Sequence, residues 1–306
     1  EVVEMPRRVG TSRNPAKHVR ASTRTLLAGA VDRLAHVAAP PADDDPTVHE
    51  VRKRCKEARA LARLLGRPSG HRAERFDAAV RDAGRAVSTL RDEQAVAGSL
   101  ETLSSTTTGR ARAAVAIVRA AGRIADPRPA DPADDAGIAA HHLATALREL
   151  ERWRPQVGIE PIADGIERSY RTARRRLASL REHPDDEHMH EWRKAVKRLW
   201  YQTRAVRDLA PSALDPMIAV LDELSDLLGD DHDLAVVVER IAAAPDSHGG
   251  AVAVADTVTA ARARQEELRA RSMRLGASLL AERPRAFRRR IESYWALAGD
   301  LGPEPI

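Results

Sequence analysis

Aromatic residues are scarce in this chain of 306 residues, which has four Trp, three Tyr and two Phe, or 3% of the total. Proteins that bind single-stranded nucleic acid usually interleave cations with rings that stack on bases, and this chain has few rings for that purpose. The single cysteine, Cys55, excludes an internal disulfide framework and falls in a helical pattern, which favours a small buried residue in a reducing cytoplasm. No apolar run approaches the roughly 18 residues of a membrane span, and the start has no hydrophobic signal segment. We therefore expect a soluble, cytoplasmic protein.

The chain also lacks the common signatures of catalysis. It has no Gly-rich phosphate loop, no Gly-x-Ser-x-Gly elbow and no Cys-x-x-Cys pair. His141 and His142 are adjacent, so on a helix they point about 100° apart and cannot chelate one metal together. The acidic run at 230–233 is expected to cap a helix break and to compensate charge rather than to bind a divalent cation. We therefore predict no enzyme, no metal site and no cofactor.

The residues that are abundant favour helices. Ala, Arg, Leu and Glu dominate and β-branched runs are short, so we predict an all-α fold. Proline and glycine punctuation marks a linker at 126–132 and a hinge at Arg154-Pro155, which divide the chain near residue 156. Helices are expected at residues 15–39, 47–66, 71–102, 109–125, 137–155, 159–183, 187–210, 214–242, 251–282 and 285–298.

One segment of the sequence occurs twice. Val-His-Glu-Val-Arg-Lys at 48–53 reappears as Met-His-Glu-Trp-Arg-Lys at 189–194, a separation of 141 residues. The same offset aligns further pairs without a gap, namely Lys56 with Lys197, Arg63 with Arg204, Arg33 with Arg174, and Arg91-Asp92 with His232-Asp233. This duplication predicts two antiparallel four-helix bundles, related by a pseudo-twofold axis and facing one basic groove or pore. The bundles are expected at 15–156 and 157–306, after a disordered segment at 1–14.

Each copy of the repeated segment divides into a basic and an apolar side on a helical wheel with about 100° per residue. The basic stripe of the first copy consists of His49, Arg52, Lys53, Lys56, Arg59 and Arg63. The basic stripe of the second copy consists of His190, Arg193, Lys194, Lys197, Tyr201 and Arg204. The opposite sides are apolar and are expected to pack inward.

Few acidic residues lie on either stripe, so the cations should repel each other by a few tenths of a kcal/mol per i,i+4 pair until an external anion relieves them. A chain of phosphates suits such a stripe, because Arg grips phosphate oxygens in a fork and Lys meets them as a point charge. Nearby phosphate should raise the pKa of the histidines, so binding should strengthen on mild acidification. A solvated amphipathic helix is the alternative for either stripe alone, but the repetition favours a polyanion-binding surface.

The pattern His-Glu-x-Arg-Lys-x-x-Lys at 49–56 and again at 190–197 resembles the hallmark of the CHAD domain, the conserved histidine α-helical domain. The runs at 170–178 and 228–236 strengthen the resemblance, which spans residues from about 15 to 298. The resemblance implies two helical bundles that face each other across a basic cavity, where inorganic polyphosphate binds without known catalysis by the domain. Family proteins associate with polyphosphate granules. Many also carry a triphosphate tunnel domain on the N-terminal side, which would suit a chain that begins at Glu1 without an initiator methionine.

Carried over by position, the resemblance implies one wall made by His49, Arg52, Lys53 and Lys56 and another made by His190, Arg193, Lys194 and Lys197. Further cations would extend these walls: Arg59, Arg63 and Arg204 along the stripes, and Arg33, Arg171, Arg174 and Arg175 from the preceding helices. The first copy departs from the pattern, because Gly29–Arg33 replaces the arginine-rich run at 171–176. The first wall is therefore expected to bind more weakly unless His18, Arg20 and Arg24 compensate. Arg91, which has an Asp beside it and aligns with His232, is expected to form an intrahelical or turn-stabilising pair at least as readily as a contact with phosphate.

Three other functions remain open from the residues. Arg and Lys stripes also grip phosphodiester backbones, so a nucleic-acid-binding module is the main alternative. A scaffold whose basic faces meet acidic partners is the second. The third is catalysis in which His49 and His190 act as general acids on a phosphoanhydride, although neither an activated nucleophile nor a set of metal ligands accompanies them.

Overall fold

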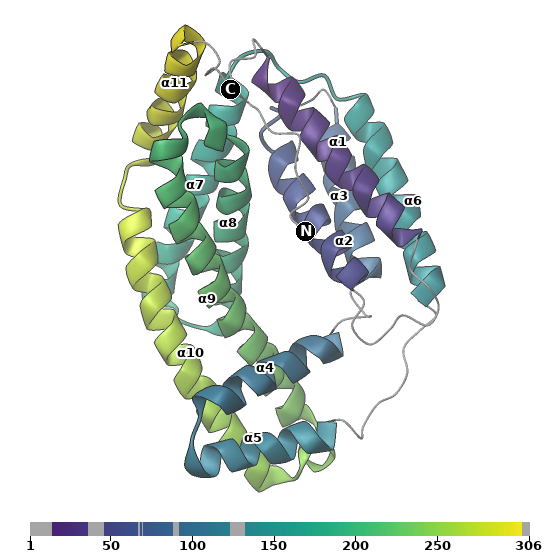
Figure 1. Ribbon diagram of the computed structural model, residues 1–306, viewed down its shortest axis with the longest axis vertical. Coiled ribbons are helices and arrows are strands. Elements are labelled where there is room, and N and C mark those ends of the chain that lie inside the picture. The colour runs from purple at the N-terminus through teal and green to yellow at the C-terminus, as the bar shows by residue number, and fades with distance from the viewer. Residues whose placement is uncertain are drawn as a thin grey trace.

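The computed structural model describes residues 14–35, 46–66, 68, 70–87, 92–122 and 132–301, and this part of the chain contains α-helices, two short 3-10 helices and no strand. The all-α prediction is confirmed (Figure 1). The helices of the first half are α1 (Pro15–Leu34), α2 (Pro46–Ala62), α3 (Arg72–Ala86), α4 (Asp92–Thr106), α5 (Gly109–Gly122) and α6 (Pro132–Glu151). Those of the second half are α7 (Glu160–Glu182), α8 (Asp186–Ala205), α9 (Pro211–Ala243), α10 (Ala251–Leu279) and α11 (Pro284–Leu301). No helix in the described residues is both long enough and apolar enough to cross a membrane.

Local capping chemistry explains where several of these helices begin. The side chain of Asn14 accepts a hydrogen bond from the backbone N–H of Lys17 at 3.2 Å, and Asp185 accepts one from His188 N–H at 2.8 Å. Each bond satisfies a backbone donor that the first helical turn leaves unpaired. Proline stands in the first turn of α1, α7 and α9, where its missing N–H costs nothing.

The prediction of one helix over 71–102 is wrong, because α3 ends at Ala86 and α4 begins at Asp92. No proline or glycine marks this boundary. The sequence between these helices contains Ser and Thr at 88 and 89, residue types with lower helix propensity than Ala, Leu or Arg. This weaker signal was missed. Arg91 lies outside the described residues, as does the predicted disordered segment apart from Asn14.

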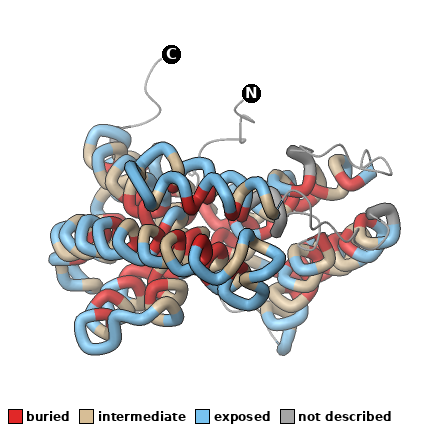
Figure 2. Tube along the Cα trace, turned by 90° about the horizontal axis from the view of Figure 1, so that it is seen from below, coloured by how far each residue is buried: buried red, intermediate tan, exposed pale blue. Residues whose placement is uncertain are grey.

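Most helices fall into two groups that share one hydrophobic core (Figures 1 and 2). The first group contains α1, α2, α3 and α6, and the second contains α7, α8, the first part of α9, the end of α10 and α11. The groups meet where α2 contacts α8. There the side-chain amide of Gln202 donates a buried hydrogen bond to the carbonyl oxygen of Ala60 at 2.8 Å. The basic sides of the two repeated helices are thus held at one junction.

Helices α4 and α5 leave the first group and pack on the second half of the chain. Their apolar side chains form a separate cluster with α9 and α10, which contains Val96, Leu100, Leu103, Val115, Val118, Leu234, Val237, Val238, Ile241 and Val254. At the offset of 141 residues, α4 aligns with the end of α9 and α5 with the start of α10. Equivalent segments of the duplication therefore pack against each other.

We predict that Gly165→Ala destabilises the protein by about 1–3 kcal/mol, the usual effect of overpacking. A Cβ at Gly165 would lie 2.8 Å from the carbonyl oxygen of Arg63 and 2.8 Å from Leu64 Cδ2, so α7 would have to move away from the end of α2. Gly137→Ala in α6 is the matched control. It has nothing within 4 Å and should stabilise by about 0.5–1 kcal/mol. Urea unfolding of both variants measures the difference, and equal stabilities would contradict the close packing of α7 on α2.

Candidate anion-binding site

The two repeated segments form α2 and α8, and each buries its apolar side as the sequence predicts. Val51 and Ala58 of α2 and Trp192 and Leu199 of α8 are each fully buried in the shared core. Cys55 is buried on the same side, and burial raises the pKa of its thiol to about 12. Because a thiol with this pKa is protonated at neutral pH, Cys55 is a core residue and not a nucleophile.

Both copies of the motif contain the same internal ion pair. Glu50 contacts Lys53 at 3.5 Å, and Glu191 contacts Lys194 in the equivalent position three residues apart. The hydrogen bond from Lys194 holds the pKa of Glu191 below its usual value. The expectation that few acids relieve the stripes is therefore wrong at these positions. The lysine that follows the motif arginine is already partly neutralised in each half.

The cations that meet between the two halves form what we call the central basic cluster. It consists of Lys53 and Lys56 of α2, His190, Arg193 and Lys197 of α8, and His232 of α9. The rings of His190 and His232 lie with centroids 4.5 Å apart at an interplanar angle of 37°. The charges of Lys56 and Arg193 act on both rings, and the charge of Lys53 acts on Lys197. The structure therefore brings members of both predicted stripes into one electrostatic environment.

Burial and mutual repulsion depress the pKa values in this cluster. Burial, followed by the charge of Arg193 and the neighbouring His190, lowers the pKa of His232 to about 4. Burial, followed by the charges of Lys194 and Arg193, also lowers the pKa of His190, whose Nδ1 atom is buried without a hydrogen-bond partner. Both imidazoles are thus neutral at pH 7.

Lys197 is the cluster member that faces acidic residues of a neighbouring helix. Burial and the charge of Arg193 lower the pKa of its ammonium group, while Asp226 and Asp222 of α9 act in the opposite direction. Burial, together with the charge of Asp222, raises the pKa of Asp226 itself. The α9 carboxylates therefore border the cluster on one side.

Arg59 and Arg63 extend the α2 stripe but are engaged by an acid on α3. Arg59 makes a bidentate ion pair with Asp77 at 2.9 and 2.8 Å, and Arg63 reaches the same carboxylate at 3.4 Å. Arg198 of α8 lies in the electrostatic field of this group, and burial together with the charges of Arg63 and Arg59 lowers its pKa to about 10. Arg59 and Arg63 thus share Asp77, and the charge of Asp77 also acts on Arg198, which the sequence did not single out.

At the other end of the α8 stripe, the aromatic residues define how the cations lie. Tyr201 is only 3% exposed, so its side chain offers no surface to a ligand although it shares the predicted phase. Trp200 next to it carries the guanidinium of Arg204 over its ring at 4.7 Å and the ammonium of Lys197 at 5.8 Å. These contacts fix the two cations by cation–π attraction.

The arginines predicted from the preceding helices are largely directed elsewhere. Arg174 donates to the carbonyl oxygens of Ala281 and Glu282, at 3.1 and 2.5 Å, and so binds the turn between α10 and α11. Arg171 pairs with Glu167 on its own helix. Arg175 is exposed, and Arg33 acts electrostatically on the buried Arg54. None of the four is among the groups that act on the histidines of the central basic cluster.

The first half of α2 carries the remaining predicted residues. His49 is exposed and Arg52 is half-buried, both on the helix that supplies Lys53 and Lys56. The equivalent pair on α8 is His190 and Arg193, which belong to the cluster. His49 is thus more exposed than its equivalent, His190.

The acidic run at 230–233 differs from its prediction, because α9 continues through it without a break. Asp231 is buried and pairs with Arg269 of α10 at 2.6 Å, while His232 stacks on His190. His232 is the site residue that sequence reasoning missed, and its alignment with Arg91 in the duplication was the signal for it. No group of three or more His, Cys, Asp or Glu side chains in the described residues is arranged to hold a metal ion.

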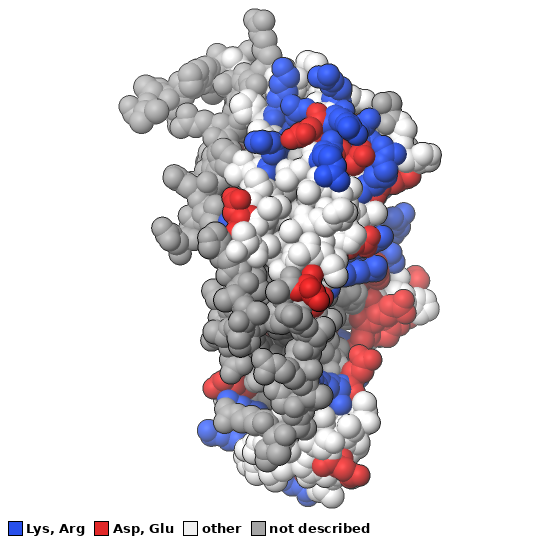
Figure 3. All heavy atoms as spheres, turned by 90° about the vertical axis from the view of Figure 1, so that its right-hand side faces the viewer, with Lys and Arg blue, Asp and Glu red and all other residues white. Residues whose placement is uncertain are grey.

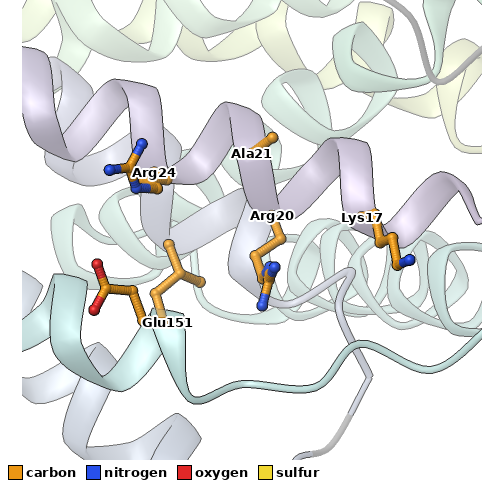
Figure 4. A pocket seen from close by; sticks show the side chains of 6 residues that line it. Lys17, Arg20, Ala21, Arg24 and Glu151 are labelled. Atoms are coloured by element: carbon orange, nitrogen blue, oxygen red, sulfur yellow. The ribbon is translucent and has the colours of Figure 1, made fainter.

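A separate basic pocket lies where α1 meets the end of α6. Its volume is about 240 Å³, and it is lined by Lys17, Arg20, Ala21, Arg24, Leu150 and Glu151 (Figure 4). Arg20 donates to the carbonyl oxygen of Trp153 at 3.0 Å. Arg20 and Arg24, which were predicted to compensate for a weak first wall, therefore line a different surface from the central basic cluster.

Comparison with known proteins agrees with the residue pattern. The family model described as the CHAD domain matches residues 25–242. A search of curated proteins found no match. The matched segment includes both copies of the motif and all members of the central basic cluster.

Proposed function

The chain belongs to the CHAD domain family, and on this basis we propose that it binds inorganic polyphosphate at the central basic cluster, as a binding rather than a catalytic module. The observation that carries the proposal is the meeting of Lys56 from the first repeat with His190 and Arg193 from the second. A linear polyanion is the ligand that such a two-sided group of cations fits best. Each phosphate unit offers several acceptor oxygens to Arg and Lys donors.

The chemistry of the cluster favours polyphosphate over nucleic acid. The aromatic side chains beside the cations are Tyr201, which is buried, and Trp200, whose ring is covered by Arg204. Neither presents a free face for base stacking, which supplies much of the affinity of single-strand binders. Polyphosphate carries its charge without bases, so charge and fork geometry alone can hold it. In the cell, we propose that this binding directs the protein to cytoplasmic polyphosphate granules.

A competition titration tests the proposed ligand. The protein is bound to a fluorescently labelled DNA, and long-chain polyphosphate or unlabelled DNA is added at matched phosphate concentration. We expect polyphosphate to displace the label at a concentration at least tenfold lower than DNA. Equal potency of the two competitors would overturn the assignment of polyphosphate as the ligand and would favour a general phosphate-backbone binder. If the protein binds neither the labelled DNA nor polyphosphate, a scaffold for acidic protein partners is favoured.

We predict that polyphosphate binds more tightly as the pH falls from about 8 to about 5. In the unliganded protein the pKa of His232 is lowered to about 4 and that of His190 is also lowered, so both are neutral over most of this range. Bound polyanion favours their charged forms and raises both pKa values, so binding takes up protons between the liganded and unliganded pKa values.

Calorimetry in buffers of different ionisation enthalpy measures this proton uptake. In the variant His190→Gln/His232→Gln the uptake should fall and the pH dependence should flatten. An unchanged pH profile in this variant would show that other groups titrate. His141→Gln/His142→Gln on α6 is the matched control and should retain the wild-type profile, since neither of these histidines is among the groups that act on the cluster.

A further inference from the structure

The pocket between α1 and the end of α6, which we call the outer pocket, concentrates cations that the central basic cluster does not use. Three of its six lining residues are Lys17, Arg20 and Arg24, and one is a carboxylate, Glu151, so the lining carries three positive charges against one negative charge. In Figure 4, Arg20 and Lys17 point from α1 toward the chain that follows α6, and Glu151 at the end of α6 lies below Arg24. Figure 3 shows the face that is on the right in Figure 1, and Lys and Arg side chains gather at the upper end of this face.

Acidic residues of the protein leave these cations largely uncompensated. Within the described residues, neither Lys17 nor Arg24 forms a side-chain ion pair, and Arg20 contacts a backbone carbonyl oxygen instead of a carboxylate. Glu149, the residue directly before Leu150 of the pocket, is already bound by Arg72 at 3.2 Å and by Arg75 at 3.1 Å. The bond from Arg20 to Trp153 also fixes the guanidinium in place, which leaves most of its donors for a ligand.

The position of the cations on α1 is itself unfavourable for an isolated helix. The N-terminus of a helix carries a partial positive charge, and acidic side chains are preferred there. The first turn of α1 has no acidic residue and contains Lys17. Backbone dipole and side chains therefore add to the same positive potential at this end of the pocket, and a bound anion would relieve both.

The duplication does not account for the outer pocket. At the offset of 141 residues, Lys17, Arg20 and Arg24 align with Gly158, Pro161 and Gly165 of the second half. The equivalent part of α7 is packed closely against the end of α2 at Gly165. The three cations are thus a feature of the first half alone, and they are not a remnant of the repeated basic stripe.

We propose that the outer pocket is a second binding site for oligophosphate, separate from the central basic cluster. The proposal deepens the proposed function and rests on it. Positions i, i+3 and i+7 of one helix place three cations along a line of about 10 Å, at a rise of about 1.5 Å per residue. A short run of linked phosphates matches this line of charges. Glu151 opposes the ligand's charge and limits its affinity, so the outer pocket is the weaker of the two sites.

Calorimetric titration with tripolyphosphate tests the proposal on the whole chain. We expect two sites in the wild-type protein. In the variant Lys17→Glu/Arg24→Glu, the weaker site should lose at least tenfold in affinity while the tighter site is retained. This variant should remain folded, because both side chains are exposed and a Glu at position 17 suits the first turn of α1. Arg285→Glu/Arg289→Glu, which reverses two exposed cations on α11, is the matched control and should keep both sites.

Two further variants separate the outer pocket from the proposed function. Glu151→Gln should tighten the weaker site, an outcome that loss of structure cannot produce. Lys56→Glu/Arg193→Glu should remove the tighter site and spare the weaker one. If Lys17→Glu/Arg24→Glu changes neither site while the central variant still removes one, the outer pocket is overturned and the proposed function stands. If the central variant has no effect, the proposed function is overturned. If the wild type does not bind, both proposals are overturned.

Discussion

Reversing the charge of Lys56 and Arg193 together is expected to weaken the binding of long-chain polyphosphate at least 100-fold. The two side chains come from different halves, and both act electrostatically on His190 and His232. A hydrogen bond to a charged group is worth about 1.5–3 kcal/mol, so the loss of two such contacts corresponds to roughly two or more factors of ten. The new carboxylates also repel the ligand. Fluorescence anisotropy with labelled polyphosphate at fixed ionic strength measures the effect.

The control for this prediction carries the same change in net charge on another surface. Arg285 and Arg289 are exposed on α11, and reversing both should reduce affinity by less than about threefold, since distant surface charges are screened by salt. Lys53→Glu/Lys194→Glu should fall between the two, because Glu50 and Glu191 already offset these lysines. Equal effects of the central and α11 variants would mean that binding follows net charge alone and would contradict a defined site.

The variant Arg269→Ala is expected to destabilise the protein by about 3–5 kcal/mol, the usual result of leaving one member of a buried ion pair without its partner. Arg269 binds Asp231, which is 2% exposed, and also the carboxylate of Asp186 at the start of α8. It therefore ties α10 to α9 and α8, directly beside the stacked histidines. Thermal unfolding monitored by circular dichroism measures the loss.

The loss of unfolding free energy in Arg269→Ala should become smaller as the pH falls from 7 toward 5. Burial already raises the pKa of Asp231 in the presence of Arg269, and removing the arginine raises it further. A carboxyl group whose folded pKa lies above its unfolded value penalises folding above the folded pKa, and the penalty disappears on acidification. Arg271→Ala, which removes an exposed pair with Glu223, is the control and should cost less than about 1 kcal/mol at either pH. A pH-independent deficit would show that Asp231 is not the group left uncompensated.

The sequence predicted the helices and the two basic stripes because both depend on local spacing. A helix turns by a fixed angle per residue, so the phase of Lys56 relative to Val51 follows from the chain alone. The prediction failed where the deciding partner comes from another element. The sequence near Arg59 does not predict its contact with Asp77 of α3, and the sequence near Arg174 does not predict its contact with the carbonyl oxygens of the turn after α10. His232 was missed for the same reason, because its contact with His190 depends on how α9 packs on α8.

Tyr201 shows a second limit of sequence reasoning. Its wheel angle places it with the cations, but the angle does not say how closely a neighbouring helix approaches, and the side chain is buried. The break between α3 and α4 shows a third. Ser and Thr lower helix propensity much less than proline does, so a helix boundary beside them is harder to predict from the sequence. For Tyr201 the periodicity was available from the sequence, whereas the neighbouring helix that buries the side chain was not.

The packing of α4 and α5 on α9 and α10 has a consequence for how the protein is made. The first half is synthesised before the second, so the apolar side chains Leu100, Leu103 and Val118 lack their partners on α9 and α10 until those helices emerge. During this interval the nascent chain exposes the apolar side of the α4–α5 pair, and exposed apolar surface favours aggregation. A truncated gene product that stops after α6 would keep that apolar side exposed permanently, so it should aggregate instead of persisting as a half-sized binding protein.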